Sequence, residues 1–105
     1  MTIIEVGDLP ADPLAAAAAF HRDWLFLVRD SMSAGRDVAL VLPFADHTHT
    51  EWRRAAVAML ARAHAPRRIN MVAGGADEAG PIVAYLEHAP GVTGQYLPAH
   101  GGPRT

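Results

Sequence analysis

The sequence predicts an α/β fold in which four strands alternate with three helices, in the order β-α-β-α-β-α-β. Short apolar or β-branched runs predict the strands, and alanine-rich segments with apolar residues at helical spacing predict the helices. The run 37–42 is apolar almost throughout, as in a strand covered on both faces. Such alternation implies parallel strands joined by right-handed crossovers. We therefore expect a Rossmann-like open sheet between two helical layers.

The boundaries of the elements follow from turn and capping residues. Asp12 and Pro13 are typical of a helix start, and Gly35 and Pro43 of the ends of a helix and a strand. With 105 residues the chain is expected to form one domain, followed by a flexible tail over 98–105. The predicted strands are 2–6, 37–42, 68–72 and 94–97, and the predicted helices are 12–34, 50–64 and 77–88.

Composition excludes several kinds of chemistry. All nine cationic residues are Arg, and the sequence contains no Lys and no Cys. Schiff bases and phosphate-binding P-loop lysines are therefore excluded, as are thiolate nucleophiles, disulfides and cysteine zinc sites. The net charge of −2 favours neither nucleic acid nor an anionic membrane as a partner. The N-terminus has neither a basic region nor a long apolar run, so we expect a cytoplasmic protein.

Two stretches resemble the short-chain dehydrogenase/reductase family. Residues 55–75, AAVAMLARAHAPRRINMVAGG, are similar to the family's helix-then-strand block KAAVxxLTRxLAxELAPxxIRVNAVAPG. Residues 82–86, IVAYL, and 92–102, VTGQYLPAHGG, are similar to its last helix and strand, VxYLxSxxxxxVTGQxLxVDGG. The resemblance implies that the chain corresponds to the C-terminal half of that fold. Its four strands would match strands 4 to 7 of a sheet ordered 3-2-1-4-5-6-7.

The chain differs from that family at the positions of the family's catalytic and phosphate-binding residues. Thr50 and Arg54 fall at the positions of the family's Tyr and Lys, and Pro43 or Phe44 near its Ser. A threonine hydroxyl is too weak an acid to protonate a carbonyl at neutral pH. The segment 7–12 holds one glycine and two carboxylates in place of a glycine-rich phosphate loop. We therefore expect a truncated, degenerate member that is not an enzyme, with no catalytic residues and no cofactor.

The helix 12–34 is apolar on more than one face, which predicts a subunit interface in addition to the core. The resemblance implies a homodimer, in which the helices 12–34 and 50–64 pack on their mates as a four-helix bundle. A larger partner subunit is the other possibility, and the outer edge of the first strand offers a second contact. The residues predicted to form the interface are Phe20, Trp24, Leu27, Ser31, Trp52 and Met59.

A different class of function is also possible. The carboxyl ends of parallel strands are where open α/β sheets bind ligands, so a small-ligand site, a metal site or a residual active site could form there across a dimer. Residues 47–49 supply two histidines but no third ligand fixed by spacing, which favours a polar loop over a metal centre. The Arg pairs 53–54 and 67–68 are predicted to be solvated or paired with acids such as Glu51 and Asp46. The predicted pocket residues are Phe44, His47, His49, Gly74, Gly75 and Asp77.

Overall fold

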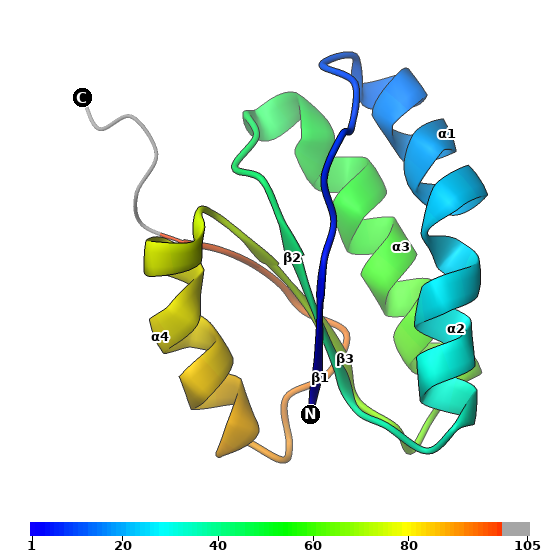
Figure 1. Cartoon of the computed structure of the whole chain (residues 1–105), viewed down its shortest axis with the longest axis vertical. Helices are drawn as coiled ribbons and strands as arrows, with labels where there is room; N and C mark the ends of the chain where they lie inside the picture. The colour runs from blue at the N-terminus through cyan, green and yellow to red at the C-terminus, as the bar shows by residue number, and fades with distance from the viewer. Residues whose placement is uncertain (100–105) are drawn as a thin grey trace.

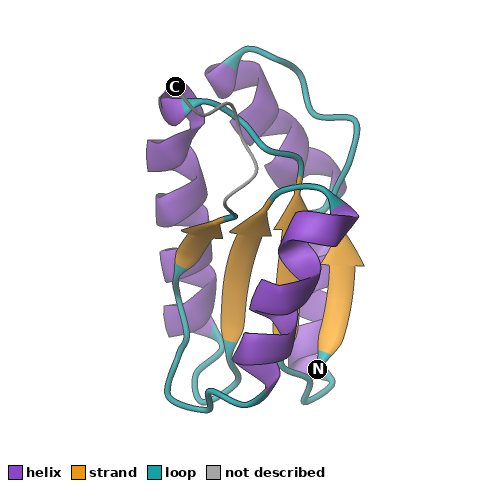
Figure 2. Cartoon of the chain, turned by 90° about the vertical axis from the view of Figure 1, so that its left-hand side faces the viewer, coloured by secondary structure: helices purple, strands orange, loops and turns teal. Residues whose placement is uncertain are grey.

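The sheet has four strands, all parallel and side by side in chain order. The structure is a computed structural model and describes residues 1–99. Figure 2 shows the strands pointing the same way, and their spatial order β1-β2-β3-β4 is the one that the family resemblance implies. The predicted Rossmann-like α/β fold is confirmed. The strands are β1 (Thr2–Glu5), β2 (Val38–Leu42), β3 (Ile69–Ala73) and β4 (Tyr96–Pro98).

The helices form a layer on each face of the sheet. Figure 1 shows α1, α2 and α3 on one side and α4 alone on the other. A short 3-10 turn over His47–His49 precedes α3. The helices are α1 (Pro13–Asp23), α2 (Leu25–Ser33), α3 (Thr50–Ala63) and α4 (Ala76–Glu87).

The prediction of one helix over 12–34 is wrong, because the chain breaks it at Trp24. That residue has φ −114°, and its N–H still bonds to Phe20 O at 2.9 Å. At about 100° per residue, Phe20 and Val28 would point roughly 80° apart on one straight helix. Both are fully buried in the same core cluster. The break therefore lets both helices direct a large side chain to the sheet.

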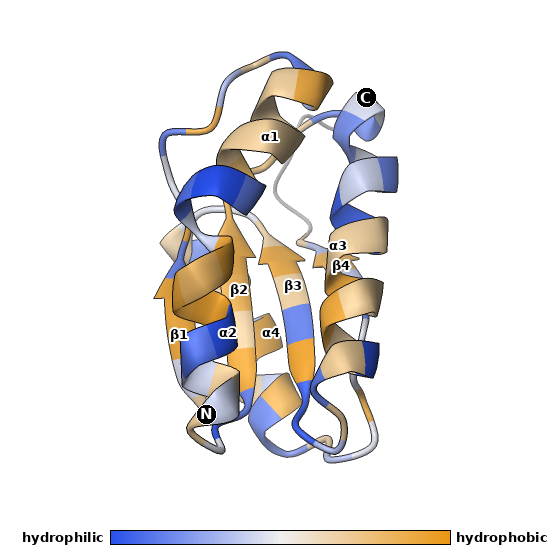
Figure 3. Ribbon diagram, turned by 90° about the vertical axis from the view of Figure 1, so that its right-hand side faces the viewer, coloured by the Kyte–Doolittle hydropathy of each residue, from blue (hydrophilic) through white to orange (hydrophobic). Residues whose placement is uncertain are grey.

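The three crossovers do not have the same hand. Figure 3 views the sheet from the side of α1–α3, with the strands pointing up and running from β1 at the left to β4 at the right. The first two crossovers are therefore right-handed. The third is left-handed, because α4 lies behind the sheet, and the prediction of right-handed crossovers throughout is wrong. The reason is that α3 already packs against both β3 and β4, whereas the opposite face is open to the apolar side of α4.

The end of the described chain belongs to the fold. Pro98 lies in β4, and Ala99 is buried, with its N–H donating to Ala73 O at 2.7 Å. The prediction of a tail is therefore wrong for residues 98 and 99. The rest of that prediction, 100–105, lies outside the described residues.

Candidate functional site

The positions that match the family's catalytic residues lie at the start of α3. Thr50 is its first residue and is half-buried, and Arg54 is exposed to solvent. Pro43 and Phe44, which follow β2, are both exposed and carry no side-chain donor. The site thus presents a threonine and a guanidinium where the family has a phenol and an ammonium.

The loop before α3 is built as a capped turn. The Asp46 carboxylate accepts hydrogen bonds from the Thr48 hydroxyl and, at 3.0 Å, from the Thr48 backbone N–H. These hydrogen bonds lower the pKa of Asp46 below its ordinary value. Both groups of Thr48 are thereby satisfied within the loop. The carboxylate therefore stabilises the turn that starts the helix.

His49 is buried and has a structural role. Its Nδ1 accepts a hydrogen bond from Trp52 Nε1 at 3.1 Å, because an indole nitrogen can only donate. The neutral ring must then carry its proton on Nε2, which donates to Ala11 O at 3.0 Å. Both nitrogens are engaged, so His49 in this arrangement has no lone pair for a metal or ligand. Within residues 1–99, no three His, Cys, Asp or Glu side chains are grouped so that they could hold a metal ion.

Of the six residues predicted to form a pocket, two line a common groove and the other four do not line it. Gly74 and Gly75 line a groove, described below, on the α4 side of the sheet. Phe44, His47 and Asp77 are exposed and do not line it, and neither does the buried His49. The prediction assumed that all loops at the carboxyl edge converge. Here the loop after β2 turns toward α3, whereas the loop after β3 turns toward α4.

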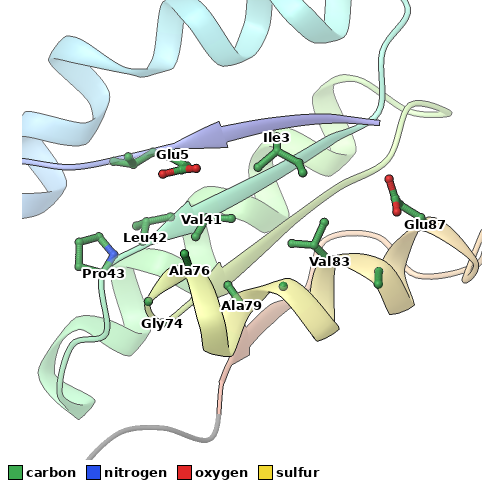
Figure 4. A pocket seen from close by; sticks show the side chains of 14 residues that line it. Ile3, Glu5, Val41, Leu42, Pro43, Gly74, Ala76, Ala79, Val83 and Glu87 are labelled. Carbon is green, nitrogen blue, oxygen red and sulfur yellow. The ribbon is translucent and has the colours of Figure 1, made fainter.

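We call this cavity the α4 groove; it has a volume of about 510 Å³ and lies between α4 and the uncovered face of β1 and β2. Figure 4 shows Ile3 and Val41 forming its floor, with Ala79 and Val83 along one wall. Ile3 remains 49% exposed although it lies in a strand. The groove is therefore an apolar surface of the sheet that the described chain does not cover.

Two carboxylates mark the ends of the α4 groove. Figure 4 shows Glu5 at one end and Glu87 at the other, both lining the cavity. Both are exposed, and among residues 1–99 neither forms an ion pair. Sequence reasoning missed both groups, because their position depends on which face of the sheet α4 covers.

Arg53 is the most unusual charged residue of the described chain. It is only 2% exposed, and its guanidinium lies near the rings of Trp52 and Tyr96, at 5.6 and 5.8 Å from their centroids. Its Nη1 donates to Pro43 O at 3.0 Å and to Tyr96 Oη at 3.3 Å, while its buried Nε has no hydrogen-bond partner within the described chain. No carboxylate of residues 1–99 pairs with it. The expectation that the Arg pair 53–54 is solvated is wrong for Arg53.

Arg68 forms an ion pair with an acid, as predicted, although the acid is neither of the two that the prediction named. It pairs with Asp37 at 3.2 Å, not with Glu51 or Asp46, and its Nη1 donates to the carbonyls of Leu86 and Ala89. Burial would raise the pKa of Asp37, but hydrogen bonds from the Arg68 backbone N–H and guanidinium outweigh it and hold that pKa below its usual value. This cluster ties the starts of β2 and β3 to the end of α4.

The predicted interface residues divide into buried and exposed ones. Phe20 is 0% exposed and cannot contact a second chain, which corrects its assignment to the interface. Trp24 and Trp52 are half-buried against the same core, and Ser31 is half-buried on α2. Leu27 and Met59 are exposed, as expected of an interface. The assignment of Phe20 assumed a straight helix, which the break at Trp24 removes.

Exposed apolar side chains nevertheless lie on both α2 and α3, and we call this region, which also includes the polar residues His21 and Arg29, the α2–α3 surface. Its exposed residues include Phe26, at 77%, and Met59, at 51%. Leu25 lies between them, because it lines one hollow with Phe26 and another, of about 200 Å³, with Met59. The other apolar residues of the second hollow are Ala56, Leu60 and Ala63.

The comparison with known families supports the resemblance seen in the sequence. A model of the short chain dehydrogenase-like protein family matches residues 4–99. The chain belongs to this family. No curated protein and no solved structure matches it significantly. In the described part of this short chain dehydrogenase-like chain, no helix is both long and apolar enough to cross a membrane.

Proposed function

We propose that this short chain dehydrogenase-like chain is a non-catalytic subunit that forms a homodimer through its α2–α3 surface. The observation that carries the proposal is the exposure of Phe26 and Met59 on neighbouring helices, with Leu25 between them. Exposed large apolar side chains that lie close together are typical of contact sites between proteins. The small exposed residue Ala63, one turn from Met59, lets a partner helix approach closely.

The symmetry of a dimer suits this surface. A two-fold axis places the same patch of each copy against the other, so one patch needs only to be complementary to itself. The family resemblance implies the same two helical segments as the dimer contact. Two pairs of helices would then pack as a four-helix bundle, and each copy would cover the apolar side chains that the other leaves exposed.

The non-catalytic part of the proposal is supported by the residues at the catalytic positions and by the start of α1, the helix that follows the first strand of this chain. Thr50 and Arg54 replace the phenol and the ammonium, and the sequence has no Lys elsewhere to substitute. At the start of α1, the Asp12 carboxylate accepts a hydrogen bond from Ala15 N at 2.9 Å. In a dinucleotide site the phosphates take such N–H groups. Here a negative side chain already occupies that helix N-terminus and repels phosphate.

Size-exclusion chromatography with light scattering tests the dimer. We expect a mass of twice 11.2 kDa at micromolar concentration, falling toward 11.2 kDa on dilution. A species that remains monomeric at all accessible concentrations contradicts the proposal.

Reduced nicotinamide cofactors with a panel of carbonyl compounds test the absence of catalysis. No cofactor oxidation above the buffer rate is expected, because no group of suitable acidity occupies position 50. Sustained turnover that scales with protein concentration, and that is lost in Thr50→Val, would show that the chain is an enzyme.

A second candidate function is the binding of a small anion at the carboxyl edge of the sheet. It is supported by Arg53, since a buried cation without a counter-charge is stabilised by an anion. A thermal-shift series with phosphate, acetate and citrate tests it. Stabilisation that Arg53→Met abolishes and that the exposed Arg54→Met retains supports this candidate. Equal stabilisation of both variants removes it.

A further inference from the structure

The α4 groove leaves part of a parallel sheet uncovered. Parallel strands are normally buried on both faces, yet on the α4 side β1 and β2 expose Ile3 and leave Val41 only half-buried. Two neighbouring strands span roughly 10 Å, which is about the diameter of one α-helix. We infer that the groove binds one amphipathic, basic α-helix from a partner polypeptide. This inference goes beyond the proposed homodimer, because the groove lies on the opposite face of the sheet from the α2–α3 surface.

The wall of the groove is suited to close helix packing. Ala76, Gly80 and Ala84 line it at intervals of four residues, which places them along one side of α4. None of the three has a side chain larger than a methyl group. The distance between two packed helices depends on the side chains at their contact, so a helix alongside α4 can approach closely here. The apolar floor requires an apolar stripe on the incoming helix.

The charges at the groove specify the polar part of the partner. Glu5 and Glu87 lie at opposite ends, and among the described residues neither has a cationic partner. Glu5 lies close to the floor residue Ile3, so its carboxylate would face one end of a helix bound in the groove. An Arg or Lys near each end of that helix would pair with these carboxylates, whereas an acidic helix would be repelled. The partner is thus an amphipathic helix with one apolar stripe and a basic residue near each end.

Two synthetic helices test this inference. Both are stapled peptides of the length of α4, 12 residues, with the same Leu and Ala stripe. One carries Arg near each end, and the other carries Glu at the same places. Fluorescence anisotropy with the full chain should show micromolar binding of the Arg peptide and about tenfold weaker binding of the Glu peptide. Equal affinities, or no binding of the Arg peptide, would overturn the inference.

A groove-filling variant locates the binding. Ala84→Leu places a larger side chain in the groove at an exposed helical position, so the fold tolerates it. We expect it to weaken binding of the Arg peptide by about tenfold, and Glu87→Gln to weaken it by roughly threefold. The matched control is Ala15→Leu, at an exposed alanine of α1 away from the groove, which should leave the affinity unchanged. Binding that is indifferent to Ala84→Leu would show that the peptide binds elsewhere.

The test also separates this inference from the homodimer. Met59→Glu should abolish dimerisation yet leave peptide binding intact, because Met59 does not line the groove. Ala84→Leu should leave the mass in light scattering unchanged. If Ala84→Leu instead reduces the oligomer, a second copy of this chain fills the groove and the inference of a distinct partner is wrong.

Discussion

The two faces of the sheet are built from side chains of different size. Under α1, α2 and α3 the core contains Phe20, Met32, Leu40 and Met71, all essentially inaccessible to solvent. Under α4 the buried side chains are mostly small, such as Ala39, Val72 and Ala79. The first face is packed against three helices, whereas the second is open over β1 and β2 (Figure 4). The first face therefore supplies most of the buried core, whereas the second includes the apolar groove that the described chain leaves exposed.

Truncating one side chain on each face tests this contrast most strongly. Phe20→Ala leaves a large cavity in the covered face and should lower the free energy of unfolding by about 3–5 kcal/mol. Val83→Ala, on the thin face, should cost only about 2 kcal/mol, since it removes two methyl groups. Chemical denaturation monitored by circular dichroism measures both. Equal decreases in the free energy of unfolding would contradict the unequal contributions of the two faces to stability.

The thin face is reinforced by the polar cluster of Asp37 and Arg68. Asp37→Asn should lower the free energy of unfolding at pH 7 by about 1–2 kcal/mol, because a charged hydrogen-bond acceptor is lost. The pKa of Asp37 is lower in the folded chain than in the unfolded one, so its stabilisation is complete above pH 4 and is lost as the pH falls further.

Urea denaturation between pH 7 and pH 2.5 measures this effect. The difference in free energy of unfolding between wild type and Asp37→Asn should become smaller as the pH falls. A difference that is the same at both ends of the range would show that the carboxylate charge contributes nothing.

The covered face contains a group that opposes its own stability, the cation of Arg53, with which no carboxylate of residues 1–99 pairs. Replacing it with an apolar side chain of similar length removes the cost of burying a charge. Arg53→Met should therefore raise the free energy of unfolding by about 1 kcal/mol, despite the loss of two hydrogen bonds. The exposed Arg54→Met is the control and should change it by less than about 0.5 kcal/mol. A lower free energy of unfolding in Arg53→Met would show that the contacts of the Arg53 guanidinium stabilise the fold by more than its burial costs.

Local patterns in the sequence predicted the elements of the fold and the family. The apolar run 37–42 and the alanine-rich helix after Thr50 are recognisable without tertiary information. The break at Trp24 is not, because it depends on where Phe20 and Val28 must both point once the sheet exists. The hand of the last crossover likewise depends on α3 having already filled one face.

The candidate sites were harder to predict for the same reason. Arg53 and Arg54 are the same residue type in adjacent positions, and only the rotation of α3 against the sheet makes one buried and the other exposed. Met59 was predicted at the interface, whereas Phe26 was not, because the break in the helix shifts which side faces outward. Gly74 and Gly75 were predicted to line a pocket, but the positions of Glu5 and Glu87 follow from the side that α4 occupies.

The proposed role as a dimeric, non-catalytic subunit is tested most directly by sedimentation velocity on one pair of variants. Met59→Glu places a charge on the α2–α3 surface, and Tyr85→Glu places one at a similarly exposed position on α4. We expect Met59→Glu to sediment as a monomer with unchanged circular dichroism, while wild type and Tyr85→Glu sediment as dimers. A wild type that is monomeric, or a Met59→Glu variant that remains dimeric, would contradict the proposal.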